Sequence, residues 1–151
     1  MDKEDPTKRL FLAVKSGDVG DAQAAMDAGA KANSRVHFQD TLLHFAARHT
    51  HPTMARLLIK NGAHVNAVGM GHETPLHWAA SHGNASIVEL LIEHGAKIDA
   101  EADDHRTPMQ LAKHHYHTDV VTLLENAAKQ QGHTSRIDDE RKDKGPRQPG
   151  G

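Results

Sequence analysis

The sequence repeats itself at a fixed interval. Thr41, Thr74 and Thr107 are each separated by 33 residues. The same interval relates three Gly-Ala pairs and the Asn or Asp that follows each pair; these are Gly29, Gly62 and Gly95, followed by Asn33, Asn66 and Asp99. A period of this length predicts a solenoid, in which each unit packs only on its two neighbours. Such a fold presents an extended surface instead of a deep pocket, so we expect a protein that holds another macromolecule.

Each unit reads as a pair of helices followed by a polar loop, and the copy that begins at Thr74 is the clearest. Thr74 is a candidate N-cap, and Pro75 stands at the first helical position, where a missing N–H costs nothing. A first helix over residues 76–82 ends at Gly83, which can adopt the left-handed conformation. Residues 86–94 carry apolar side chains at helical spacing and predict a second helix. The fold class is therefore all-α, with one apolar core shared between repeats.

The start of the first helix carries a distinctive motif. Residues 74–80 read Thr-Pro-Leu-His-Trp-Ala-Ala, and residues 41–47 read Thr-Leu-Leu-His-Phe-Ala-Ala. A weaker copy at residues 107–113 has Gln110 in place of the histidine and a lysine in place of the second alanine. These motifs resemble the ankyrin repeat, and the resemblance covers about residues 6–131. It implies an ankyrin-repeat α-solenoid whose loops form β-hairpin-like fingers, with a concave, L-shaped groove lined by helices and fingers.

The chain divides into a leader, a repeat domain and a tail. The tail is rich in Gly, Pro and charged residues, and Ile137 is its only large apolar residue. It cannot bury enough apolar surface to order itself, so we expect it to be disordered. The first and last repeats depart from the motif, as capping repeats do. The expected boundaries are 1–5 for the leader, 6–131 for the ankyrin-repeat domain with repeats at about 6–38, 39–71, 72–104 and 105–131, and 132–151 for the tail.

Composition argues against several classes of function. The formal net charge is −2, which gives no electrostatic basis for binding nucleic acid. The chain has no cysteine, hence no disulfide framework and no thiolate metal site, and this fits a cytoplasmic location. No apolar run reaches the roughly 18 residues that a membrane span requires. We find no nucleophile–base pair and no phosphate-binding loop, so we expect neither an enzyme nor a bound cofactor. We also expect the protein to be a monomer when no partner is bound.

Histidine is present in excess, with 14 copies. His44 and His77 belong to the motif, and the ankyrin resemblance implies that each forms hydrogen bonds tying one loop to the next. His51 and His117 stand where a second helix begins, a position at which that family often has histidine. We therefore expect a structural role for these two residues as well.

A further set of histidines shares another register. His49, His82 and His115 fall near the end of each first helix, and stacked repeats would place them in a line at roughly 8–10 Å spacing. Three interpretations are open: a solvated row, a row that contacts a partner, or a metal site. Zn–N bonds of about 2.0–2.1 Å are hard to satisfy at this spacing, which disfavours a metal. The local cluster of His114, His115 and His117 also lacks the i, i+4 pair that suits a metal on one helix face.

The loops between repeats contain apolar residues where exposure is expected. We name residues 34–40, 67–73 and 100–106 fingers 1, 2 and 3. Apolar groups in exposed segments often mark a partner site, although they can instead tuck against neighbouring fingers. Finger 3 is acidic, so we expect the groove to be apolar toward one end and negative toward the other. The apolar side chains are Val36, Phe38, Val68 and Met70, and the acidic ones are Glu101, Asp103 and Asp104.

Together these features predict a non-catalytic adaptor or inhibitor that binds a partner protein through its groove and fingers. The alternative is a histidine-rich metal-binding or pH-responsive protein. The candidate partner-binding residues are Val36, Phe38, Arg48, His49, Val68, Met70, Glu73, Ser81, His82, Asp103, Arg106, His114 and His115.

Overall fold

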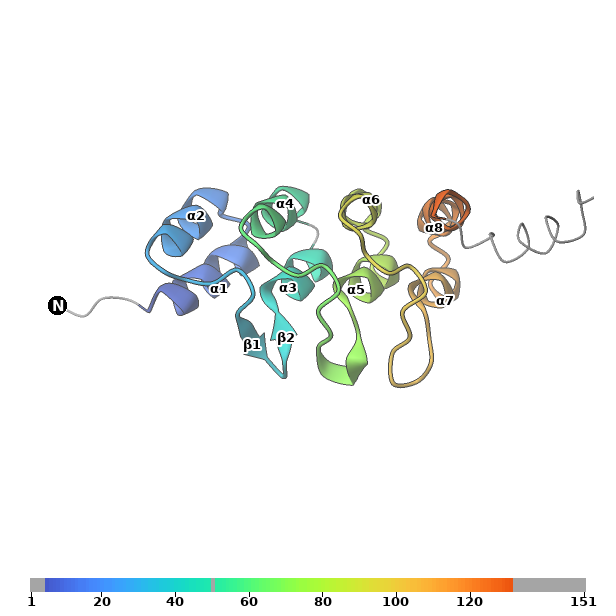
Figure 1. The fold of residues 1–151 in the computed structure, drawn as a ribbon, viewed down its shortest axis with the longest axis horizontal. Coiled ribbons are helices and arrows are strands. Elements are labelled where there is room, and N and C mark those ends of the chain that lie inside the picture. The colour runs from blue at the N-terminus through green and yellow to red at the C-terminus, as the bar shows by residue number, and fades with distance from the viewer. Residues whose placement is uncertain (1–4, 50, 132–151) are drawn as a thin grey trace, which may run out of the picture.

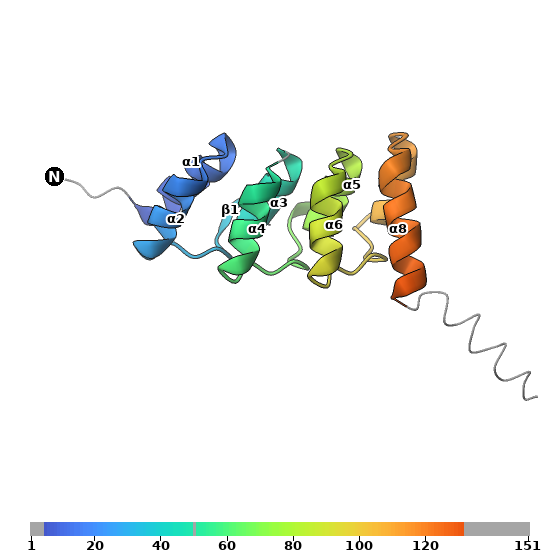
Figure 2. The ribbon, with the colours of Figure 1, turned by 90° about the horizontal axis from the view of Figure 1, so that it is seen from above.

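The protein is an all-α solenoid in the computed structural model, which describes residues 5–49 and 51–131. Two rows of helices run along the molecule, and loops project from one of the rows (Figure 1). Seen from above, the helix pairs of successive repeats lie side by side along the long axis (Figure 2). The inner helices, on the side of the loops, are α1 (Pro6–Ser16), α3 (Leu42–Arg48), α5 (Pro75–Ser81) and α7 (Pro108–His114). The outer helices are α2 (Val19–Asp27), α4 (Pro52–Lys60), α6 (Ala85–Glu93) and α8 (Thr118–Gln130).

Threonine caps fix where the inner helices begin. The Thr74 hydroxyl accepts a hydrogen bond from the backbone N–H three residues further on, and Pro75 occupies the first turn of α5. Thr107 caps α7 through the same contact. Gly83 follows α5 with a φ of 72°, the left-handed conformation that ends a helix. The predicted helix pair is confirmed, with each boundary shifted by one residue.

The core lies between the two rows of helices. Leu58, Ile87, Leu90 and Leu91 from the outer helices are buried in one apolar cluster, and Leu57 packs against it from a partly exposed position. The inner helices present buried alanines to this cluster, and their small side chains let the two rows approach closely. The predicted core shared between repeats is therefore confirmed. The alanines are Ala13, Ala46, Ala79 and Ala112.

The three fingers project from the inner row (Figure 1). In finger 1, β1 (Arg35–His37) pairs with β2 (Asp40–Thr41) as an antiparallel hairpin. Finger 2 instead contains a short 3-10 turn, η1 (Met70–His72), and finger 3 has no strand or helix within the residues that the structure describes. The ankyrin resemblance implied hairpin-like fingers. Finger 2 keeps a hairpin-like turn, which is closed by a 2.8 Å hydrogen bond from the Gly69 N–H to the Glu73 carbonyl.

Two of the expected segments fall largely outside this description. The leader is described only from Asp5, whose carboxylate accepts the Thr7 N–H at 3.1 Å and so caps α1. The tail, residues 132–151, lies wholly outside the described residues. The boundaries and the disorder expected of these segments stay predictions.

The buried outer-helix leucines generate a stability prediction. Leu90 is only 2% exposed, so Leu90→Ala should leave a cavity and lower the free energy of unfolding by about 2–5 kcal/mol. Glu89→Ala on the exposed side of the same helix is the control and should change stability by less than about 0.5 kcal/mol. Urea denaturation followed by far-UV circular dichroism measures both. A loss of under about 1 kcal/mol for Leu90→Ala would contradict this packing.

Candidate partner-binding groove

A buried imidazole joins each of two inner helices to the finger of the next repeat. His44 Nδ1 accepts the Thr41 N–H at 3.0 Å, and His44 Nε2 donates to the Glu73 carbonyl at 2.8 Å. Because Nδ1 accepts a backbone proton, only Nε2 can carry one, and the ring is neutral. His77 repeats the arrangement and donates to the Arg106 carbonyl at 3.0 Å. Burial is the main cause that lowers the pKa of both histidines from 6.5. The predicted structural role is confirmed.

Side chains of finger 1 also hold finger 2 in place. The Arg35 guanidinium donates to the Val68 carbonyl at 2.7 Å. The Asp40 carboxylate accepts the Met70 N–H at 3.0 Å. Finger 3 is joined to finger 2 by a backbone hydrogen bond of 2.8 Å. The fingers therefore form one connected row beside the inner helices.

On the outer side of the solenoid, asparagines link successive repeats. Asn33 donates to the Gly62 carbonyl at 2.7 Å and accepts the His64 N–H at 2.7 Å. Asn66 makes the same two contacts with the following repeat. One amide side chain thus satisfies a donor and an acceptor of its neighbour, which fixes the distance between repeats.

The histidines at the start of the outer helices pack between repeats. His117 Nε2 donates to the Ser81 carbonyl at 2.9 Å, and a Cβ placed on Gly83 would lie 2.6 Å from the His117 ring. A Cβ on Gly17 would similarly lie 2.9 Å from the His51 ring. These rings occupy space that only glycine leaves open, so the structural role expected of both histidines is confirmed.

The predicted row of histidines exists at the C-terminal ends of the inner helices. His82 lies within electrostatic range of both His49 and His115. Burial and then the positive charge of Arg48 lower the pKa of His49. Desolvation and then His114 lower the pKa of His115. Among the described residues, no group of three His, Asp or Glu side chains is arranged to hold a metal ion.

Two histidines of this row stack on aromatic rings of the inner helices. The His82 ring stacks on Trp78 with 6.0 Å between centroids, and the His49 ring stacks on Phe45 at 6.3 Å. The Arg48 guanidinium lies 5.2 Å from the centre of the Trp78 ring, a cation–π contact between neighbouring repeats. Trp78 packs at the edge of the core, half-buried, with Arg48 over the indole. The Trp78 Nε1–H is buried and has no hydrogen-bond partner.

The apolar finger residues divide into two kinds. Phe38 is 75% exposed and Met70 is 58% exposed, and both stand at finger tips. Val36 is half-buried and packs against the core cluster. Val68 is also half-buried, with its carbonyl engaged by Arg35. The two valines are therefore packed against neighbouring residues, whereas Phe38 and Met70 present apolar surface to solvent.

The acidic finger residues face a cation in the same segment. Arg106 forms a 2.7 Å ion pair with Asp104. The hydrogen bond from the Arg106 backbone N–H, and then this side-chain contact, lower the pKa of Asp104. Burial and then Asp104 raise the pKa of the half-buried Glu73. Asp103 is exposed and is tied to finger 2 only through its backbone N–H. Glu73, Asp40, Asp104 and Arg106 therefore form a mixed cluster in which carboxylates predominate.

The candidate residues thus fall into two groups, one on the fingers and one at the C-terminal ends of the inner helices. The exposed ones are Phe38, Arg48, His49, Met70, His82, Asp103, Arg106, His114 and His115, and the partly exposed ones are Val36, Val68, Glu73 and Ser81. Ser81 contributes its carbonyl to the contact with His117, which gives that position a structural use as well.

Tyr116 belongs with the second group, and the sequence analysis did not select it. It follows His115, is 86% exposed, and has a φ of 62° where Gly83 stands in the previous repeat. A non-glycine residue in the left-handed region costs of order 1–3 kcal/mol. The replacement of the repeat's glycine was the available signal. A bulky aromatic side chain kept at that cost is a candidate contact residue.

Comparison with known families agrees with this geometry. A family model described as ankyrin repeats, in three copies, matches residues 10–102. The chain therefore belongs to the ankyrin-repeat family, whose repeats are generally protein–protein interaction modules. α7 and α8 lie beyond the matched residues and continue the same helix-pair arrangement. A search of curated proteins found no match. Within the described part of the chain, no helix has the length and apolar character needed to cross a bilayer.

The buried histidines predict how stability depends on pH. Because the pKa of His77 is lowered in the folded state, the unfolded chain protonates this ring first as the pH falls below 6.5. Stability should therefore be highest above pH 6.5 and decrease as the pH falls toward the folded-state pKa. His77→Gln keeps the cap, as Gln110 does in α7, but removes the titrating ring. It should cost about 1–3 kcal/mol near neutral pH and weaken the dependence on pH.

Urea denaturation at about pH 7.5, 6.5 and 5.5 measures this effect. His64→Gln is the matched control, because His64 is exposed and its hydrogen bonds to other described residues use only its backbone N–H and carbonyl. Equal pH profiles for wild type and His77→Gln would show that the buried ring does not control acid stability.

The strained turn gives a separate prediction. Tyr116→Gly removes a side chain from a left-handed position and should raise the free energy of unfolding by up to about 1 kcal/mol, because the relief of strain exceeds the entropy that glycine adds to the unfolded chain. Tyr116→Ala keeps the unfavourable φ and serves as the control, with no such gain. Thermal denaturation of the two variants compares them directly, and a lower midpoint for the glycine variant than for the alanine variant would contradict the strain.

Proposed function

We propose that the protein is a non-catalytic binding module, an adaptor or inhibitor, that holds a partner protein between its fingers and its inner helices. The observation that carries this proposal is the pair of exposed apolar side chains, Phe38 and Met70, on neighbouring fingers. Exposed apolar groups rimmed by polar ones often mark protein-binding sites. Membership of the ankyrin-repeat family supports a protein as the ligand.

The rigidity of the fingers supports the same proposal. The contacts of Arg35 and Asp40 hold finger 2 against finger 1, so the two apolar tips are positioned before a partner arrives. Binding then requires little ordering of the loops, and this reduces its entropic cost. A few well-positioned anchors dominate the affinity of most interfaces. Phe38 and Met70 are the anchors in this proposal, with the inner-helix group as the second contact.

A metal-binding role has less support, because the described residues offer no set of three ligating side chains. A role in binding nucleic acid is disfavoured by the formal net charge of −2. We further propose a cytoplasmic protein that is monomeric when no partner is bound, in line with the absence of cysteine.

The finger tips can be tested with short peptides selected from a random library for binding to the full chain. The double change Phe38→Ala and Met70→Ala should weaken binding about tenfold or more, equivalent to about 1.4 kcal/mol, because both anchors are lost. The matched control is Thr53→Ala with Arg56→Ala on the exposed side of α4. Isothermal titration gives the affinities, and circular dichroism checks that both variants keep their helices.

The same peptides also locate the contact surface. Amide hydrogen exchange should show protection on the fingers and the inner helices when peptide is bound. Protection confined to the outer helices, together with unchanged affinity of the finger variant, would move the site to the opposite face and overturn the proposal.

A further inference from the structure

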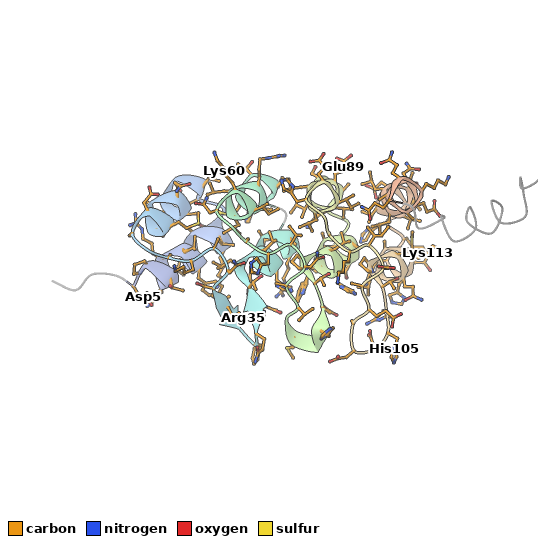
Figure 3. All side chains as sticks on the ribbon, in the orientation of Figure 1. Asp5, Arg35, Lys60, Glu89, His105 and Lys113 are labelled. Atoms are coloured by element: carbon orange, nitrogen blue, oxygen red, sulfur yellow. The ribbon has the colours of Figure 1, made fainter. Side chains whose placement is uncertain are left out.

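Charge is sorted between the two rows of helices. Across the four inner-helix ranges, all of which the structure describes, there is no Asp or Glu. The same ranges contain five Lys or Arg residues, at positions 8, 9, 15, 48 and 113. Three of the four outer helices, α2, α6 and α8, contain carboxylates, whereas α4 contains none. Figure 3 labels Glu89 on α6 and Lys113 on α7. The inner row therefore offers cations without carboxylates of its own.

The cationic groups gather at the C-terminal ends of the inner helices. His49 is influenced by the positive charges of Lys15 and Arg48 and by the rings of His51 and His82. His115 is influenced by His82, His114, His117 and Arg106 in the same way. These interactions connect four repeats in one line. We name the exposed part of this line the basic edge: Lys15, Arg48, His49, His82, His114 and His115.

The cations of the basic edge lack carboxylate partners, unlike two of the arginines elsewhere in the molecule. Arg9 pairs with Asp21 on α2, and Arg106 pairs with Asp104 within finger 3. In the described part of the chain, neither Lys15 nor Arg48 forms an ion pair with a carboxylate; each lies over an aromatic ring at 5.2 Å instead. The groups facing His49 are all basic or imidazole. The field along the edge is thus uncompensated.

We propose that the basic edge is the docking surface for an acidic segment of the partner protein. This inference rests on the proposed binding function and names the chemistry of the bound segment. Aspartate and glutamate side chains of that segment lie beside Lys15, Arg48 and the exposed histidines at the C-terminal ends of α3, α5 and α7. The exposed carboxylates of finger 3, Asp103 and Asp104, set which way round the segment binds.

Charge complementarity favours a protein segment over nucleic acid as the occupant. The finger carboxylates Asp40 and Asp104 each lie close enough to Glu73 to raise its pKa, after the larger effect of burial. A polyanionic duplex that covered the groove would be repelled there, whereas a peptide can place acidic residues at one side and apolar residues at the other. The finger tips Phe38 and Met70 suit the apolar part of such a segment.

Binding of an acidic segment is coupled to proton uptake by the histidines. Desolvation, and then neighbouring basic groups, oppose protonation of His49 and His115 in the free protein, and a carboxylate placed beside the two rings favours it. The complex therefore holds more protons than the free components, and affinity increases as the pH falls from about 8 to about 6. Added salt weakens the same contacts, because exposed charges are screened.

The test uses the full chain and three labelled peptides of equal length and equal apolar content. One is rich in Glu and Asp, one in Lys, and one in Gln and Ser, and a single-stranded oligonucleotide is the fourth probe. Fluorescence anisotropy at about pH 6 and 8, with low and high salt, should show the acidic peptide binding about tenfold more tightly than the neutral one. Its advantage should grow at the lower pH and shrink in salt.

Two matched variants separate this edge from general charge. Arg48→Gln, His49→Gln and His82→Gln together remove one arginine and two histidines from the edge. Arg56→Gln, His64→Gln and His94→Gln remove the same residue types from exposed positions outside it. The first variant should abolish the advantage of the acidic peptide and its pH dependence, whereas the second should retain both. Circular dichroism confirms that each variant is folded.

Several results would overturn the inference. Equal losses in the two variants would reveal non-specific charge attraction, and tighter binding of the oligonucleotide would assign the edge to nucleic acid. Preference for the neutral or the Lys-rich peptide, lost on changing Phe38 and Met70, would refute the acidic segment while leaving the proposed binding function intact. If neither these probes nor peptides selected from a library bind at all, both proposals fail.

Discussion

The groove depends on one side chain, the buried imidazole of the Thr-x-x-His motif. In His44 and His77 the ring accepts the N–H that starts its own helix and donates to a carbonyl in the next finger. The position of each finger is therefore set by the same group that sets the start of the helix. A ring that accepts at one nitrogen and donates at the other must be neutral, and burial keeps it so. Gln110 in α7 retains the capping contact alone.

The helices could be predicted from the sequence because their determinants are local and recur in several of the repeats. Threonine caps, proline in the first turn and glycine after the last turn each act within a few residues. The fingers were predicted less well, since their shape depends on contacts between different repeats. Asp40 reaches the Met70 N–H beside Gly69, where a Cβ would lie 2.0 Å from the Asp40 carboxylate. Repeat spacing contains no information about such a pair, and strands form only in finger 1 among the described residues.

The candidate site shows the same division. The row of His49, His82 and His115 followed from a shared register and could be predicted. The contact of Arg48 with Trp78 could not, because it joins positions 30 residues apart that are unrelated in the repeat pattern. A charge gradient along the solenoid was expected from finger 3. The structure adds a second charge gradient, which runs across the groove from the carboxylates of the fingers to the cations at the C-terminal ends of the inner helices. This gradient is seen only when the charges of the helices and those of the loops are considered separately.

The asparagine links between repeats have a consequence for recognition. Asn33 and Asn66 hold consecutive repeats through hydrogen bonds of 2.7–3.1 Å, and such bonds tolerate little stretching. Equivalent positions on successive inner helices are consequently presented at a nearly constant interval. A bound chain must place its own contacting side chains at a commensurate interval, or else leave some of them without a partner. The solenoid therefore discriminates between ligands of identical composition by the order and separation of their residues.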